Sequence, residues 1–138
     1  MAERETEKIA LVLVDHGSRN ADANAVVERT ARDLAQQTGE RFVAVEAAHM
    51  ELASPSLAEA FDAAVASGAG LVIVVLFFLG PGRHSQRDIP ALVERGAERH
   101  PRVRFVISDP LGPDQRLVDL ALLRAGETIS RRTPAPSR

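Results

Sequence analysis

Cysteine, tryptophan and tyrosine are all absent from this chain of 138 residues. Without cysteine there can be no disulfide, no thiolate metal site and no cysteine-ligated iron–sulfur cluster. The absence of tryptophan and tyrosine removes the main side chains on which single-stranded nucleic acid stacks. The formal net charge is −2, so a basic surface for nucleic acid is missing too. We therefore expect no nucleic-acid partner.

Long hydrophobic runs are also missing. The longest apolar run, at 71–79, has nine residues, whereas a helix that crosses a membrane needs about 18 or more. Residues 1–8 are charged and lack the apolar centre of a signal peptide. We therefore expect a cytoplasmic protein without membrane contact. The hydrophobic content of 45% is enough for one domain with a core of its own.

Strand and helix patterns alternate along the chain. The order βαβαβαβα predicts a three-layer α/β fold of flavodoxin-like winding, in which helices cover both faces of a four-stranded, mainly parallel sheet. The expected domain spans 8–126, with flexible ends at 1–7 and 130–138. Strands are expected at 9–14, 42–47, 71–79 and 103–107, and helices at 20–37, 54–68, 88–98 and 115–125.

The helix ends carry capping signals. Asn20 or Asp22 can cap the first helix, and Ser56 and Glu59 have the spacing of a capping box at the second. Pro90 is expected early in the third helix, where proline is tolerated. The apolar spacing predicts that the first helix packs on the sheet through Ala23, Val26, Val27, Thr30 and Leu34.

Histidines follow two of the expected strands. The sequence D-H-G-S-R follows the first strand at 15–19, and G-P-G-R-H-S follows the third at 80–85. In a 2-1-3-4 strand order these strands are neighbours about 4.8 Å apart, so His16 and His84 could bind one atom at the switch point of the sheet. Two neutral imidazoles bind divalent metals such as cobalt, iron, nickel or zinc. Such an open pair suits the delivery of a metal better than its storage.

Other side chains near these strand ends leave alternatives open. A single histidine at a strand end can simply cap a loop. Glu51 shares a strand face with His49, and either side chain could be a ligand or a base, or be merely solvated. Arg19, Arg83 and Arg87 suit carboxylate groups, but they could simply be exposed.

His100 and the D-H-G-S sequence at 15–18 do not indicate a function. His100 follows a helix between an arginine and a proline, so we expect it at the surface. The D-H-G-S sequence at 15–18 lacks the G-x-S-x-G elbow of the α/β hydrolases, and the chain contains neither a G-x-G-x-x-G nor a Walker loop. A serine hydrolase and a dinucleotide-binding or nucleotide-hydrolysing protein are therefore not indicated.

Several spaced motifs together carry a family resemblance. They are H-G-S-R at 16–19, M-E-L-A-S-P-S-L at 50–57, V-L-F-F-L at 75–79 with G-R-H at 82–84 and D-I-P at 88–90, and P-L-G-P-D at 110–114. This combination resembles the small sirohydrochlorin chelatases, the cobaltochelatase and ferrochelatase group of the class II chelatases. The resemblance spans about 8–126. The chain lacks the histidine-rich segment and the cysteines of longer relatives, which leaves its choice of metal open.

The resemblance implies an ATP-independent lyase that inserts cobalt, or alternatively iron or nickel, into sirohydrochlorin in cobalamin or siroheme biosynthesis. His16 and His84 match the two histidines of the family, so both are expected to be catalytic and to bind the metal. We expect His16 to be the chief proton acceptor. The metal is a substrate, and no cofactor is expected to stay bound. The residues expected to line the tetrapyrrole pocket are Ser54, Leu79, Gly80, Pro81, Gly82 and Arg83.

The resemblance also bears on assembly. Larger class II chelatases resemble two such units with the ring held between them, so we expect a homodimer in which the second copy supplies the opposite wall. The helix at 115–125 and the loops around Glu51 are the expected contacts. Two alternatives remain: a carrier of metal or tetrapyrrole on the same fold, without turnover, or an interaction domain in which both histidines are structural.

Overall fold

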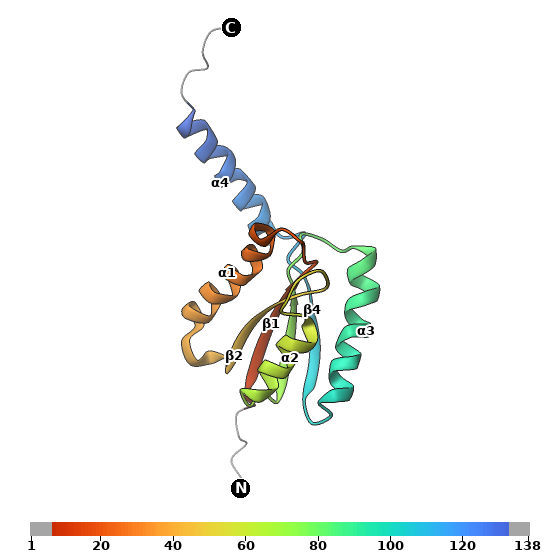
Figure 1. Cartoon of the computed structure of the whole chain (residues 1–138). Helices are drawn as coiled ribbons and strands as arrows, with labels where there is room; N and C mark the ends of the chain where they lie inside the picture. Colours follow the sequence, from red (N-terminus) through yellow and green to blue (C-terminus); the bar gives the residue numbers. More distant parts are fainter. Residues whose placement is uncertain (1–6, 133–138) are drawn as a thin grey trace.

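The computed structural model describes residues 7–132, and of residues 84–86 it describes the backbone alone. Strands and helices alternate along the chain as expected (Figure 1). In chain order they are β1 (Ile9–Asp15), α1 (Ala21–Thr38), the 3₁₀ helix η1 (Gly39–Arg41), β2 (Ala44–His49), α2 (Leu57–Ala66), β3 (Leu71–Leu76), α3 (Arg83–Arg99), β4 (Arg104–Pro110) and α4 (Gln115–Arg131).

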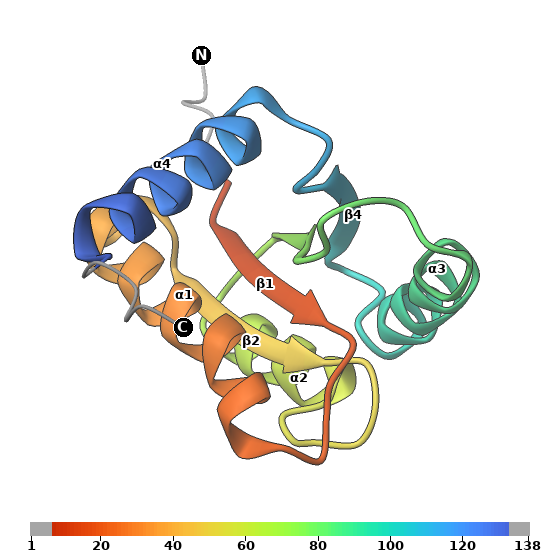
Figure 2. The ribbon, with the colours of Figure 1, turned by 90° about the horizontal axis from the view of Figure 1, so that it is seen from above.

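The four strands form one sheet in the order β2-β1-β3-β4, and every neighbouring pair is parallel. This confirms the predicted α/β class and the 2-1-3-4 order. Viewed from above, α1 and α3 lie on opposite sides of the sheet (Figure 2). Because all strands are parallel, their carboxyl ends lie at one edge, where an open α/β sheet presents its ligand crevice.

Alternate residues of β1 enter two separate cores. Val12 and Val14 are fully buried in the core under α2 and α3, where the largest fully buried side chain is that of Phe61. Leu11 and Leu13 point the other way and pack with α1. Burial on both faces is the mark of a central parallel strand, and it makes β1 the rigid support for the residues that follow it.

Several predicted boundaries were wrong by two to five residues. β2 begins at Ala44 rather than at 42, since residues 42–43 form a bend after η1, and it extends to His49 rather than ending at 47. α3 begins at Arg83 rather than at 88, so Pro90 lies inside the helix and not in its first turn. β3 ends at Leu76 rather than at 79, where its pairing with β1 stops.

The predicted inward face of α1 was only partly right, since Val27 is buried and Leu34 packs on the core, whereas Ala23 is exposed. Val26 is 56% exposed, and the residues that α1 buries are Asn24, Val27 and Ala31. The apolar pattern missed part of this face because a polar residue, Asn24, occupies one of its positions. Of the two predicted caps, Asn20 is the one observed, since its side chain accepts a hydrogen bond from the backbone N–H of Asp22. The capping box of Ser56 and Glu59 is confirmed as well.

The last helix is longer than expected and stands away from the sheet. α4 runs from Gln115 to Arg131 instead of ending at 125, and none of its residues is buried. Figure 1 shows it projecting from the body of the molecule. The predicted flexible ends fall largely outside the described residues, although Glu7 forms an ion pair with Arg104. Between residues 7 and 132, no helix is long and apolar enough to cross a membrane.

Candidate functional site

His16 stands at the carboxyl edge of the sheet, directly after β1. Its side chain is exposed, and its ring lies edge-on to that of Phe78, with 4.6 Å between the ring centroids. Phe78 is buried and follows β3, the neighbour of β1. The predicted neighbouring ends of β1 and β3 are therefore confirmed, and the exposed His16 rests there on the ring of Phe78.

The backbone segments that follow β1 and β2 stay hydrogen-bonded to each other beyond the sheet. The backbone N–H of Met50 donates to Asp15 O at 2.9 Å, and that of Glu51 donates to His16 O at 3.2 Å. Gly17 allows this approach: its φ is +86°, and a Cβ built there would lie 1.9 Å from Glu51 O. Only glycine fits such a position. The result is a fixed arrangement that holds Glu51 beside His16.

His49 was expected to be solvated or a ligand, and this was wrong. Its side chain is fully buried at the end of β2. Nδ1 lies 2.6 Å from Asp15 Oδ1, and Nε2 lies 3.0 Å from Glu28 Oε2. Burial alone would lower the pKa of His49, but the hydrogen bonds to Glu28 and Asp15 outweigh it and raise the pKa above its ordinary value. With two carboxylates as acceptors, the ring donates from both nitrogens and has no lone pair for a metal.

α1 holds the loop after β1. The side chain of Asn24 accepts from Ser18 N at 2.9 Å and donates to Ser18 O at 2.7 Å. Glu28, one turn further along α1, is the residue that reaches His49. Sequence reasoning missed both residues. The available signal was a pair of polar residues at i and i+4 beside the apolar stripe, a spacing that places both on one helix face.

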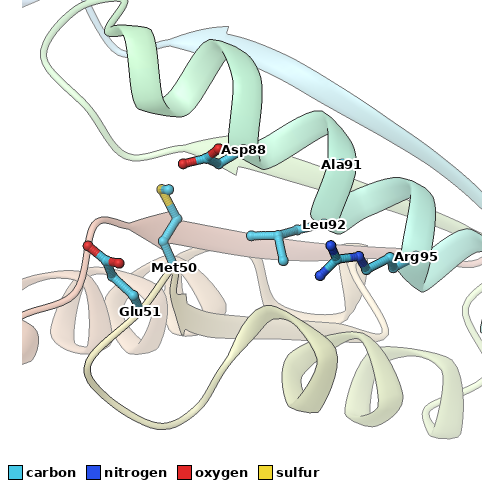
Figure 3. Close-up of a pocket in the computed structure, with 6 residues that line it drawn as sticks. All are labelled: Met50, Glu51, Asp88, Ala91, Leu92 and Arg95. Carbon is cyan, nitrogen blue, oxygen red and sulfur yellow. The ribbon is translucent and has the colours of Figure 1, made fainter.

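A pocket of about 240 Å³ opens between α3 and the loop after β2. Figure 3 shows Met50 and Glu51 facing this side of α3. Charges of both signs line the pocket, from the guanidinium group of Arg95 and the carboxylates of Glu51 and Asp88. The lining residues are Met50, Glu51, Asp88, Ala91, Leu92 and Arg95.

The expected partner of His16 lies at the start of α3. His84 is the second residue of this helix, one turn before Asp88, but its side chain lies outside the described residues, so its pairing with His16 stays a prediction. The loop before it is open to solvent. Leu79 is 74% exposed, Gly80 is half-buried, and 81–83 are exposed.

The remaining predicted residues are placed as follows. Ser54 is exposed, and its hydroxyl donates to the carboxylate of Glu59 at 3.0 Å, which helps Ser56 to lower the pKa of Glu59. Arg19, Arg83 and Arg87 are all exposed. His100 lies far along the chain from the site and is half-buried rather than at the surface, with Nε2 2.8 Å from Asp62 Oδ1.

The described side chains form no multidentate metal site, and His84 is not among them. Among the side chains that the structure describes, no three histidine, aspartate or glutamate residues cluster closely enough to hold an ion. A structural zinc site would need about four such ligands. One exposed imidazole with a carboxylate nearby can bind a divalent metal weakly and release it.

The CbiX family model matches residues 10–128 of this sequence. The chain belongs to the CbiX family. A sirohydrochlorin ferrochelatase of the chloroplast of Arabidopsis thaliana is 42% identical over 120 residues, covering 87% of this chain and 52% of that protein. A sirohydrochlorin cobaltochelatase of Methanopyrus kandleri is 33% identical over 141 residues, covering 88% of this chain and 97% of that protein.

Solved structures agree with this membership. The chelatase SirB of Bacillus subtilis subspecies spizizenii, in complex with cobalt, superposes with a TM-score of 0.79 at 28% identity, covering 87% of this chain and 50% of SirB. A CbiX protein of Marinobacter aquaeolei VT8 has a TM-score of 0.77 at 31% identity, with 90% and 99% covered. This CbiX chain thus spans about half the length of the Arabidopsis relative and of SirB.

Proposed function

We propose that this CbiX chain inserts a divalent metal, cobalt first and iron or nickel as alternatives, into sirohydrochlorin without ATP. The observation that carries the proposal is His16, exposed on the Phe78 ring at the switch point of the sheet. The names of the relatives support the substrate, since they are sirohydrochlorin ferrochelatases and cobaltochelatases. The metal is a substrate here, and we propose no cofactor that stays bound.

The chemistry asks for two things that this edge of the sheet offers. Two pyrrole protons must leave the ring, and the metal must be held against one of its faces. A neutral imidazole can accept a proton or bind the metal near neutral pH. We assign His16 as the chief proton acceptor and His84, at the start of α3, as the second metal ligand.

The surroundings of His16 suit an acidic macrocycle. Sirohydrochlorin carries eight carboxylates, and the exposed guanidinium groups of Arg19, Arg83 and Arg87 flank this edge. The pocket of about 240 Å³ below Glu51 is smaller than a drug-sized site, typically about 300–1,000 Å³. It can take a side arm of the ring, while the ring itself lies over the exposed loop at 79–83 and the loop that contains Ser54.

We also propose a homodimer whose second copy covers the other face of the ring. α4 carries an exposed apolar stripe that nothing in the described chain buries, with Val118 59%, Leu122 73% and Ile129 73% exposed. These residues recur at the spacing of one helix face. Val106 of β4 is 44% exposed on the side of the sheet that α1 covers only over β1 and β2.

The area available is compatible with a stable pair. At 1.5 Å per residue, α4 is about 25 Å long. Two such helices, each about 10 Å wide and each packed on the other copy, would bury about 1,000 Å² in total, the lower limit for a specific interface. Each helix would then contact the exposed apolar face near Val106. The expected location in the cytoplasm remains a prediction, and the Arabidopsis relative is named as chloroplastic.

An anaerobic insertion assay tests the activity. Sirohydrochlorin in about hundredfold excess over protein is mixed with cobalt, iron or nickel, and the metallated product is followed by its absorbance. Many turnovers per chain, above the rate without protein, are expected. Formation of a single equivalent of metal complex would instead identify a carrier, and no binding of metal or tetrapyrrole would leave an interaction domain.

A further inference from the structure

A partly buried set of polar side chains joins the end of β2 and the loop after β1 to α1. Its members are Asp15, Asn24, Glu28 and His49, which we name the exit frame. At its centre, His49 is fully buried between Asp15 at 2.6 Å and Glu28 at 3.0 Å. Across the described residues, no buried side-chain nitrogen or oxygen lacks a hydrogen-bond partner. A fully satisfied buried network is rigid and costly to disturb.

The exit frame lies immediately below the site. Asp15 and His49 are partners at the last position where β1 and β2 are in register. The next residue after Asp15 is His16, and Glu51 follows His49 by two. Main-chain hydrogen bonds from Met50 N and Glu51 N then link the segments that follow the two strands. Whatever fixes the Asp15–His49 pair therefore also fixes where His16 and Glu51 emerge.

α1 braces both sides of this junction from one face. Asn24 holds the loop after β1 through two hydrogen bonds to the backbone of Ser18, at 2.9 and 2.7 Å. Glu28, four residues later, holds β2 through His49. Residues four apart lie one above the other on a helix. One rigid helix thus sets the distance between the two backbone segments, after β1 and β2, that carry the site.

We propose that His49 is a positioning residue for metal insertion, clamped between Asp15 and Glu28 so that His16 is held against Phe78 and beside Glu51. The inference rests on the function proposed above. His49 is too deeply buried to touch metal or ring, and both of its nitrogens are occupied. Its effect is therefore indirect, as for the outer partners that orient metal ligands in other proteins.

The variant His49→Gln tests the proposal, with His100→Gln as the matched control. His100 also bonds a carboxylate, Asp62 at 2.8 Å, but it takes no part in the exit frame. His49→Gln should lower kcat by about 10- to 100-fold and weaken cobalt binding by about tenfold, since loss of an outer partner disturbs the ligand it orients. The KM for sirohydrochlorin should change less than kcat, because the ring contacts proposed for the loop at 79–83 lie outside the exit frame. His100→Gln should change neither.

Glu28 provides a second route if His49→Gln does not fold. Its side chain is 36% exposed, so substitution there is milder. Glu28→Gln keeps an oxygen that can accept from Nε2 and should retain most of kcat, whereas Glu28→Ala should lose about tenfold. Rescue by the amide is not expected if Glu28 serves only general stability.

Two results would separate this proposal from the function on which it rests. Parent-like kcat in Glu28→Ala, or in folded His49→Gln, would overturn the positioning role while insertion itself stands. If the parent chain does not insert metal, the proposed function fails. Cobalt affinity, measured by titration of metal into apoprotein, then decides the positioning role alone, and equal affinity in parent and Glu28→Ala would overturn it.

Discussion

α1 and α4 are helices of similar length, 18 and 17 residues, and each has a side-chain cap at its start. They differ in that α1 packs on the sheet and α4 does not. α1 buries Asn24, Val27 and Ala31 against the sheet. α4 buries no residue, although its apolar content is high. Local sequence therefore makes both helices, whereas the surface that receives a helix decides whether it packs.

The same contrast divides the carboxyl edge of the sheet. On the α1 side, the exit frame and Gly17 fix the ends of β1 and β2 within narrow limits. On the other side, Leu79 and residues 81–83 are exposed to solvent. The proposed metal insertion needs both conditions, because the metal must be held in a defined place while a broad ring enters and leaves.

The largest effect on stability and activity is expected from adding a side chain at Gly17, in the junction between the loops after β1 and β2. Gly17→Ala places a methyl group 1.9 Å from Glu51 O at a φ of +86°. The unfolding free energy should fall by at least about 2 kcal/mol, since the left-handed backbone alone costs a non-glycine residue about 1–2 kcal/mol. Insertion should fall about 100-fold, because the loop must shift away from Glu51. Urea unfolding and the insertion assay measure both, and a variant with parent values would show that the junction is loose.

The exposed helix α4 is tested at Leu122. Leu122→Glu puts a charge in the centre of the exposed stripe, and it should weaken self-association at least about 100-fold, since an unpaired charge in an interface is costly. Sedimentation at micromolar protein should give about twice 14.9 kDa for the parent and 14.9 kDa for the variant. Glu127→Gln, on the opposite face of α4, should remain dimeric. A parent that is monomeric and fully active at nanomolar concentration would contradict the dimer.

A smaller effect is expected from pH, again on the α1 side of the carboxyl edge. The pKa of His49 is raised in the folded protein by Glu28 and Asp15 despite its burial. The protonated ring therefore stabilises the fold below an ordinary histidine pKa of about 6.5, and this contribution is lost as the pH rises through the folded value. Urea unfolding from pH 6 to 9 should show the loss in the parent and not in His49→Gln. Parallel pH curves for the two proteins would mean that His49 is not charged in the fold.

The smallest effect should come from Gly126 of α4. It is exposed, and nothing lies within 4 Å of a Cβ built there. Gly126→Ala should therefore raise the unfolding free energy by about 0.5–1 kcal/mol through helix propensity alone. It is the counterpart of Gly17→Ala, because the same glycine-to-alanine substitution should stabilise exposed α4 and destabilise the packed loop after β1. A loss of stability on thermal unfolding would imply that α4 is already tightly packed.

The sequence was sufficient for the fold class, the strand order and the caps. These depend on local patterns and on general rules for parallel sheets, which is why the capping box of Ser56 and Glu59 was predicted correctly and Asn20 was one of two caps expected for α1. Boundaries were less predictable. The end of β3 depends on where pairing with β1 stops, and the apolar residues after Leu76 continue the run without continuing the ladder.

The candidate site was predictable only in part. His16 could be found because a chemically distinctive residue follows a buried strand. The burial of His49 could not, because it depends on Asp15 and Glu28, which lie 34 and 21 residues away in the sequence. Polar side chains of this kind leave no periodic apolar pattern in the sequence. Each of them, considered alone, is of a residue type usually found at the surface.

The most direct measurement of the central claim is the turnover of His16→Ala in the anaerobic insertion assay, beside His84→Ala and the control His100→Ala. Loss of the proton acceptor or of its co-ligand should lower turnover at least about 100-fold in each of the first two variants, as is usual for a key acid–base group. His100→Ala should keep the parent rate, because its contacts lie with Asp62 and away from the strand ends. Insertion at the parent rate by His16→Ala would contradict the assignment of the reaction to this edge of the sheet.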